Sequence, residues 1–153
     1  SMEARFSTPA QRIDPLAGVE RVVTTLAAYV PASYDGQNRS GYTPLGARVL
    51  ILPDVAEEQT IKGIHLPPDV AARNGMAAET GVLVALGEGA FAWSGDRIHP
   101  WTGRRPAPGD RVVIERFTGQ IERGLDGQVY RICEDRAIGA LIQVPNVEED
   151  KHE

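Results

Sequence analysis

The sequence is poor in the residues that most often carry metal binding or disulfide chemistry. Its 153 residues include one cysteine and three histidines. A single cysteine excludes an intrachain disulfide and is compatible with a reducing compartment. The histidines His65, His99 and His152 are far apart, and none has a partner at metal-ligand spacing. We therefore expect no metal site.

Long apolar runs and clusters of positive charge are also missing. No apolar run approaches the roughly 20 residues that a membrane-spanning helix needs, and the N-terminus lacks the basic-then-apolar pattern of a secretory signal. The net charge is −5, and Arg104-Arg105 is the basic doublet of the sequence. Binding to nucleic acid or to an anionic membrane needs clustered Lys and Arg. We expect a cytoplasmic protein that binds neither.

The common catalytic motifs are absent as well. The sequence has no Gly-x-Ser-x-Gly elbow, Walker loop or His-Glu-x-x-His helix, and Gly87-Glu88-Gly89 lacks the third glycine of a dinucleotide fingerprint. Cys133 lies in an apolar stretch that is typical of a buried, inert thiol. We predict no catalytic residues, no cofactor and no enzymatic activity.

From Pro44 onward, short apolar runs alternate with Gly, Pro and Asp. This pattern predicts strands separated by turns, and Asp126-Gly127 is a strong hairpin signal. Several short strands with such punctuation favour an all-β fold, a small and partly closed β-barrel that hides most sheet edges. The predicted strands are 47–52, 81–86, 111–115, 128–133 and 138–144.

The first 43 residues form a separate N-terminal extension. Apolar residues recur there at helical spacing from Leu16 to Val30, after Asp14-Pro15 and before Pro31. Asp at an N-cap and Pro in the first turn start a helix, and a later Pro stops it. We predict a helix over 15–30, a polar linker over 32–41 and, at the other end of the chain, an acidic tail over 145–153.

A short apolar plug lies in a polar stretch between two predicted strands. Because Pro67 and Pro68 favour extended backbone before them, Ile64 and Leu66 share one face and His65 points the other way. Gly63 would let a partner's backbone approach closely. This arrangement indicates either a flexible hook for another protein or a short core strand followed by a surface loop.

The aromatic residues Phe91, Trp93 and Trp101 gather in one excursion bounded by Gly and Pro. With Arg97, Arg104 and Arg105 beside them, they could stack on single-stranded bases. Aromatic residues that face each other across a hairpin are more ordinary, so we favour cross-strand or subunit packing.

Five segments, in order, resemble the GroES-type co-chaperonins, the ten-kilodalton chaperonin family. The segment 44–51 is similar to the family's Pro-Leu-x-x-Arg-Val strand, and 62–67 to its Gly-Gly-Ile-x-Leu mobile-loop signature. The other matches are the Gly-x-Val-x-Ala-Val-Gly strand at 80–89, the Gly-Asp-x-Val turn at 108–112 and the closing Asp-Ile-Leu-Ala segment at 134–140.

The resemblance implies a barrel over 44–144, with a mobile loop at about 57–79 and a roof hairpin at about 90–105. It implies a ring, expected to be a heptamer, that caps a GroEL-type chaperonin in its ATP- or ADP-bound state and encloses unfolded client proteins. Three sets of residues carry the implied roles: Gly63, Ile64, His65 and Leu66 bind the chaperonin; Leu45, Ile138, Leu141 and Ile142 form the subunit interface; Phe91, Trp93 and Trp101 build the roof.

The departures from the family pattern matter too. Lys62 replaces a glycine, His65 replaces an apolar residue, and the N-terminal extension has no counterpart in the short form. We interpret the chain as an extended, divergent member, such as a bacteriophage or a host with several chaperonins would encode. One alternative is an oligomeric structural or adaptor module that no longer binds chaperonin. Another is a dehydrogenase with a GroES-like barrel, which would need clustered Cys and His ligands or a dinucleotide-binding domain.

Overall fold

The computed structural model describes residues 29–57 and 67–143. The chain divides into two compact units, Ser1–Val30 with Val55–Leu66, and Pro31–Asp54 with Pro67–Glu153. No helix in these described ranges is long and apolar enough to cross a membrane.

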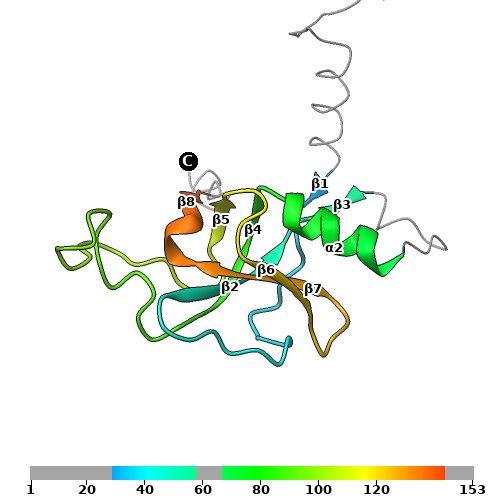
Figure 1. Ribbon diagram of the computed structural model, residues 1–153, viewed down its shortest axis with the longest axis horizontal. Helices are drawn as coiled ribbons and strands as arrows, with labels where there is room; N and C mark the ends of the chain where they lie inside the picture. Colours follow the sequence, from blue (N-terminus) through cyan, green and yellow to red (C-terminus); the bar gives the residue numbers. More distant parts are fainter. Residues whose placement is uncertain (1–28, 58–66, 144–153) are drawn as a thin grey trace, which may run out of the picture. The chain divides into compact units, whose positions relative to one another are not determined.

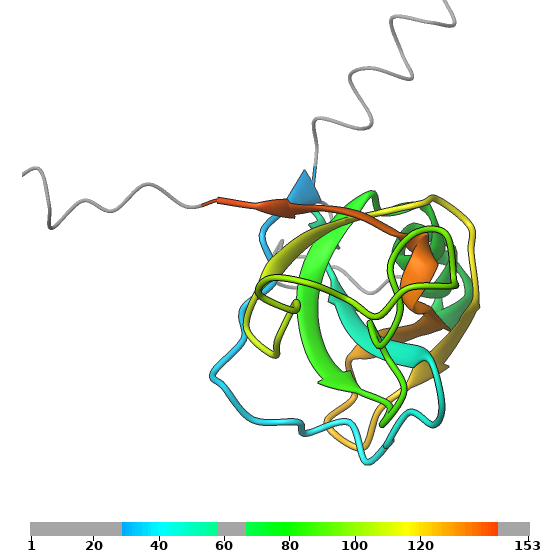
Figure 2. The same cartoon turned by 90° about the vertical axis from the view of Figure 1, so that its left-hand side faces the viewer.

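The larger unit is built on one antiparallel sheet that curves around a core (Figures 1 and 2). Its strand order is β6-β7-β2-β4-β5-β8, and within the described residues the edge strands β6 and β8 do not pair with each other. The sheet is therefore a partly closed barrel, which confirms the all-β prediction. Its strands are β2 (Arg48–Pro53), β4 (Thr80–Leu86), β5 (Arg111–Ile114), β6 (Gln120–Arg123), β7 (Val129–Glu134) and β8 (Ile138–Ile142).

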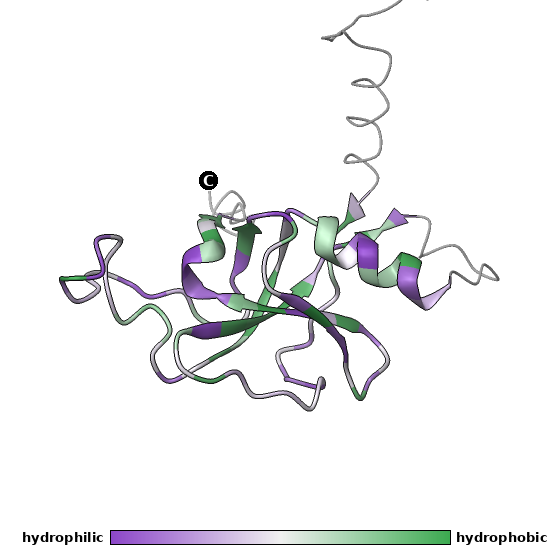
Figure 3. Ribbon diagram, in the orientation of Figure 1, coloured by the Kyte–Doolittle hydropathy of each residue, from purple (hydrophilic) through white to green (hydrophobic). Residues whose placement is uncertain are grey.

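The central strand β2 is buried on both faces because its side chains alternate between two clusters. Val49 and Ile51 join the cluster inside the barrel, while Leu50 and Leu52 join a second cluster on the other face. Figure 3 shows green, apolar stretches along the strands of the sheet. Burial on both faces explains why this segment is an almost continuous apolar run rather than an alternating one.

The five strands expected from sequence are all present, with boundaries shifted by one or two residues. The Asp126-Gly127 turn does join two antiparallel strands, β6 and β7, with Gly127 at φ 84°. Strand β6 itself was missed, because Gln120–Arg123 is short and carries three polar residues in four. Its place in the sheet comes from pairing with β7.

The prediction of a loop over 57–79 differs from the structure in its second half. Helix α2 spans Pro68–Ala77 and contacts β6 and β7. Proline in the first turn and Asp69 near the positive end of the helix favour its start. Asn74 and Gly75 are poor helix formers, so the sequence pattern alone was weak and docking on the sheet stabilises the helix.

Residues 31–43 form a strap on the second cluster, and the prediction of a linker over 32–41 is wrong. Tyr34 and Tyr42 pack against the cluster, and the Tyr42 hydroxyl donates to the Arg123 carbonyl at 2.8 Å. The polar residues that indicated a linker form hydrogen bonds with one another instead. The Asn38 side chain accepts hydrogen bonds from both the backbone N–H and the hydroxyl group of Ser40. Such local bonds are common where Asn and Ser build turns.

In the smaller unit, two short strands pair in antiparallel fashion. Strand β1 (Tyr29–Val30) lies against β3 (Val55–Ala56), with Tyr29 opposite Ala56 and Val30 opposite Val55. The last two residues of the helix predicted over 15–30 are thus strand, because a partner strand is available. The rest of that helix and the acidic tail lie outside the described residues.

Candidate functional site

The proposed hook, Gly63, Ile64, His65 and Leu66, lies outside the described residues. Its two flanks are described. On one side the chain passes through β3 and reaches Glu57; on the other it enters α2 directly after Pro67. The described structure therefore defines what holds the ends of the segment rather than the segment itself.

Asp54, the residue before β3, is the centre of a buried ion pair. Its carboxylate is 5 % exposed and receives both guanidinium nitrogens of Arg111, at 2.9 and 2.7 Å. It also accepts the Ala32 N–H at 2.9 Å and the Thr80 hydroxyl. Burial by itself would raise the pKa of Asp54, but the hydrogen bonds from Arg111, Thr80 and Ala32 outweigh burial and hold the pKa below its usual value.

Sequence reasoning missed this ion pair. Asp54 and Arg111 are 57 positions apart, and neither belongs to a recognisable motif. The pair connects the strap, β4 and β5 at the point where the chain leaves the larger unit. It fixes Asp54, the last residue of the larger unit before the chain runs on toward the proposed hook.

Within residues 90–105, for which the resemblance implied a roof hairpin, the chain turns back on itself around residues 94–99. Trp93 and Pro100 form a bridge, and the Ser94 N–H donates to the His99 carbonyl at 2.7 Å. At its tip, the Asp96 carboxylate accepts bonds from the Ser94 hydroxyl and the backbone of His99, and these bonds lower the pKa of Asp96. The turn is therefore stabilised locally.

The three aromatic residues assigned to the roof do not share one role. Phe91 is 4 % exposed and belongs to the barrel core, where its ring meets that of Trp101 edge to face at 5.5 Å. Trp93 is 48 % exposed. Trp93 is thus exposed on the hairpin, whereas Phe91 and Trp101 join the hairpin to the barrel.

A buried carboxylate fastens the hairpin to the barrel. Asp135, in the short 3-10 helix η2 (Asp135–Ala137), accepts the Phe91 N–H at 2.8 Å and the Arg97 guanidinium at 3.1 Å. A hydrogen-bonded carboxylate that is almost fully buried is costly to leave without partners. No local sequence pattern predicts this contact, because Asp135 and Arg97 are 38 positions apart.

The residues predicted for the subunit interface lie on and near two elements. Ile138, Leu141 and Ile142 are in β8, which within the described residues pairs with β5 on one side. Leu45 precedes β2 and is 66 % exposed. Strand β2 has a hydrogen-bonded neighbour on both sides, so its backbone cannot pair with a strand of another subunit. A subunit contact near β2 would therefore use side chains that precede it, such as Leu45.

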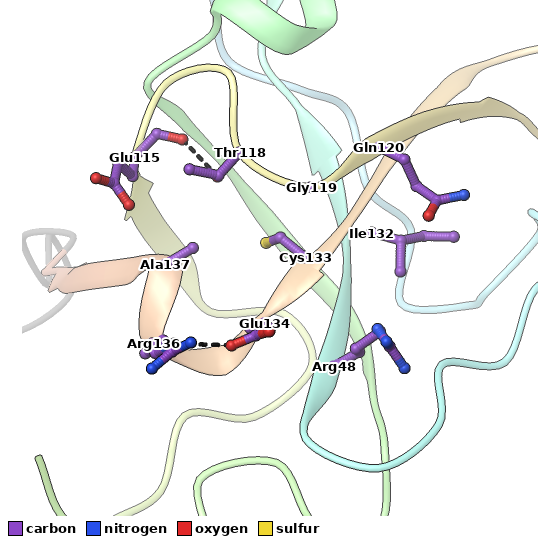
Figure 4. A pocket seen from close by; sticks show the side chains of 10 residues that line it. All are labelled: Arg48, Glu115, Thr118, Gly119, Gln120, Ile132, Cys133, Glu134, Arg136 and Ala137. Atoms are coloured by element: carbon purple, nitrogen blue, oxygen red, sulfur yellow. Dashed lines mark hydrogen bonds and ion pairs between the residues drawn. The ribbon is translucent and has the colours of Figure 1, made fainter.

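A hollow of about 420 Å³ lies between β7, η2 and the connection from β5 to β6. Figure 4 shows Cys133 in its middle, with Arg136 beside Glu134, 2.7 Å apart, and Arg48 further along. Burial raises the pKa of the Cys133 thiol to about 11, so the thiol stays protonated at neutral pH and is a poor nucleophile. The ion pair satisfies its own charges.

Metal-ligand chemistry is likewise not assembled where the structure can be described. Within residues 29–57 and 67–143, no three His, Cys, Asp or Glu side chains come together in a group that could hold a metal ion.

Comparison with known proteins places the chain in a family. The model of the family described as "Chaperonin 10 Kd subunit" matches residues 41–142. The co-chaperonin GroES of Bacillus sp. (strain PS3) is 37 % identical over 100 residues, which cover 65 % of this chain and 97 % of that protein. The co-chaperonin GroES of Geobacillus stearothermophilus is 36 % identical over 99 residues, covering 65 % and 96 %. On this evidence, the chain belongs to the chaperonin 10 Kd subunit family.

Proposed function

We propose that this protein is a co-chaperonin that assembles as a ring, expected to be a heptamer, and caps a GroEL-type chaperonin in its ATP- or ADP-bound state to assist the folding of enclosed clients. The family match over the whole barrel carries this proposal.

Ring assembly is supported by the edge strand β8. Its sequence Ile-Gly-Ala-Leu-Ile is apolar, and Leu141 is 36 % exposed. An apolar strand with a free edge is a template for pairing with another chain. A contact between β8 of one subunit and the exposed Leu45 region of the next is head-to-tail, and such contacts generate closed rings when their rotation closes.

Chaperonin binding is assigned to the hook, Ile64 and Leu66, with His65 between them and Gly63 before them. Burying the two apolar side chains would contribute roughly 3–6 kcal/mol gross, whereas ordering a segment on binding costs about 2–5 kcal/mol. One hook alone therefore binds weakly. Several hooks on one ring act at high effective concentration and can raise avidity by about 10² to 10⁴.

The hook is tested by replacing Ile64 and Leu66 together with serine. The variant is expected to form the same ring by light scattering but to lose nucleotide-dependent co-sedimentation with the chaperonin. Unchanged co-sedimentation would refute the assignment of the hook. A ring that forms normally while the wild-type protein also fails to bind chaperonin would instead favour a structural or adaptor module.

The interface is tested with Leu141→Glu, which places a charge on the edge strand. A monomer that retains the β-sheet signal in circular dichroism is expected. A ring of unchanged mass would contradict the role of β8.

A further inference from the structure

Two residues of the hairpin over 91–101 have a backbone conformation that their side chains rarely adopt. Phe91 has φ 57° and Arg97 has φ 63°, both in the left-handed region that glycine enters without steric cost. Phe91 is also 4 % exposed, and a positive φ at a bulky residue is a genuine outlier. Such strained residues persist only where the surrounding structure holds them in place.

One carboxylate holds both residues. Asp135 accepts the Phe91 N–H at 2.8 Å and the Arg97 guanidinium at 3.1 Å, although it is 44 and 38 positions away from them in the sequence. It is the first residue of η2, and its own N–H donates to the Ala47 carbonyl at 2.9 Å. The strained backbone is therefore held from outside the hairpin, by an element that is attached to the residue before β2.

Within the hairpin, short-range hydrogen bonds join the two arms. The Ser94 N–H donates to the His99 carbonyl at 2.7 Å, and the Trp101 N–H donates to the Ala92 carbonyl at 3.0 Å. In Figure 1 this connection between β4 and β5 projects from the sheet. Because an isolated two-stranded hairpin is at best marginally stable in water, a hairpin detached from Asp135 should lose the protection of these two N–H groups.

The ion pair between Arg97 and Asp135 also joins the two walls of a groove of about 380 Å³. Trp93 and Arg97 belong to the hairpin wall, whereas Asp135, Arg136 and Ile138 belong to the opposite wall. The Asp135 side chain is 3 % exposed and that of Arg97 is 38 % exposed. Loss of the pair would remove a direct connection between the walls and let the groove widen.

From these contacts we propose that Asp135 is a conformational switch for the hairpin. When its carboxylate is bonded to Phe91 and Arg97 the hairpin is closed, and when it is not bonded the hairpin opens while the barrel stays folded. Strain favours opening, because both residues can then return to negative φ. The switch is a property of the single chain and goes beyond the proposed function. In the proposed ring, where this hairpin is expected to form the roof, opening would change the roof and leave the barrel intact.

The first test measures hydrogen exchange of the full-length protein at the Ser94 and Trp101 N–H groups, with the amides of β4 as the reference for unfolding of the barrel. Asp135→Asn removes the charge and nearly keeps the shape of the side chain. Hydrogen bonds to a charged group change an equilibrium by about 10- to 100-fold, so both hairpin amides should exchange faster than in wild type by about this factor. They should also exchange faster than the β4 amides of the same variant.

Two further variants accompany this test. Glu134→Gln changes the neighbouring carboxylate, whose ion pair with Arg136 is exposed on both sides, at 54 % and 68 %, so the exchange rates should stay at their wild-type values. Arg97→Met removes one contact of Asp135 and leaves the bond from the Phe91 N–H, so it should give a smaller increase in the same direction. If Asp135→Asn does not fold, this milder variant decides the test.

The second test separates strain from simple attachment. In an Asp135→Ala background the ion pair is already lost, so Arg97→Gly changes only the backbone preference at that position. Relief of the strain outweighs the added freedom of glycine, and the two hairpin amides should exchange about two- to fivefold more slowly than in Asp135→Ala alone. Ile98→Gly in the same background is the matched control. Ile98 is 71 % exposed and is not among the residues with positive φ, so glycine there should only speed exchange.

Each outcome supports or overturns the switch. If Ser94 and Trp101 exchange at the rate of the β4 amides in both Asp135→Asn and Arg97→Met, the hairpin opens only with the barrel and the switch is refuted. If Arg97→Gly speeds exchange as Ile98→Gly does, the backbone at Arg97 is not strained and the driving force for opening is refuted. Neither measurement involves a chaperonin, so failure of the switch is distinguishable from failure of the proposed function.

Discussion

Replacing Asp54 with asparagine keeps the shape of the side chain but removes its charge, at the last residue of the larger unit before β3. The carboxylate is almost fully buried and holds the Arg111 guanidinium by two bonds of 2.9 and 2.7 Å. In the variant, the amide NH₂ group would face one of the guanidinium donors. The guanidinium would then be left with a neutral and partly mismatched partner.

The loss of stability should be large. Removing one member of a buried ion pair costs about 3–5 kcal/mol. Because the Arg111 side chain is 22 % exposed, water can compensate in part, and we expect a decrease near the lower limit, about 3 kcal/mol. With an m-value of about 1–3 kcal/mol/M in urea, the unfolding midpoint at pH 7 should fall by roughly 1–3 M.

The pH dependence gives an independent check. The pKa of Asp54 is lowered on folding, so this carboxylate contributes stability above its unfolded pKa of about 3.9, and that contribution is lost as the pH falls through the folded value. The difference in free energy of unfolding between wild type and Asp54→Asn should therefore be constant from about pH 5 to 7 and shrink below about pH 4.

Two controls accompany the measurement. Asp35 pairs with Arg39 on the surface, where exposed pairs contribute little, so Asp35→Asn should leave the urea midpoint unchanged. Replacing the buried pair together, Asp54→Leu with Arg111→Met, should recover part of the loss. An Asp54→Asn variant within about 0.5 kcal/mol of wild type at pH 7, or a difference that grows in acid, would refute the reasoning.

Three further predictions concern the roof, the strap and the thiol. Asp135→Ala should leave the Phe91 N–H and Arg97 without their acceptor and lower the free energy of unfolding by about 2–3 kcal/mol. Quenching of tryptophan fluorescence by acrylamide should increase, because the hairpin is no longer attached to the barrel by Asp135. Unchanged quenching would contradict this role of Asp135. Tyr42→Ala should lower the free energy of unfolding, measured by chemical denaturation, by about 2–3 kcal/mol, because it removes packing on the second cluster. Tyr42→Phe loses only the hydrogen bond of the hydroxyl group and should lower it by less than about 1 kcal/mol. Equal losses in the two variants would show that packing is not the main contribution of Tyr42. Cys133 should react with a thiol reagent at pH 8 only after unfolding, because burial raises the pKa of Cys133 to about 11; rapid labelling of the native protein would disprove its burial.

The parts of the site that sequence could predict are those with local signals. Strand β4 follows from an apolar run between glycines, and the hairpin of β6 and β7 from Asp126-Gly127. The hook, nominated from two apolar side chains between a glycine and two prolines, lies outside the described residues and stays a prediction. In each case the signal lies within about ten residues, and turn chemistry or strand periodicity expresses it directly.

Helix α2 shows why the rest could not be predicted in the same way. Its sequence contains Asn74 and Gly75, which weaken a helix, and the glycine is needed because a larger residue would meet Ile121 and Val129. The strap over 31–43 is a similar case: a polar, turn-rich composition indicated a linker, whereas its tyrosines pack on a cluster formed by strands far along the chain.

The sequence by itself determined the all-β class, five of the strands of the sheet, the turn between β6 and β7 and the resemblance that leads to the family, because these depend on short-range periodicity and turn residues. Only the tertiary structure decided which charges are buried together. Asp54 with Arg111, Asp135 with Arg97, and Arg131 with the end of α2 each join segments at least 38 positions apart. Such partners are selected by the cost of burying a charge without hydrogen bonds, and that cost arises only once the sheet has brought them together.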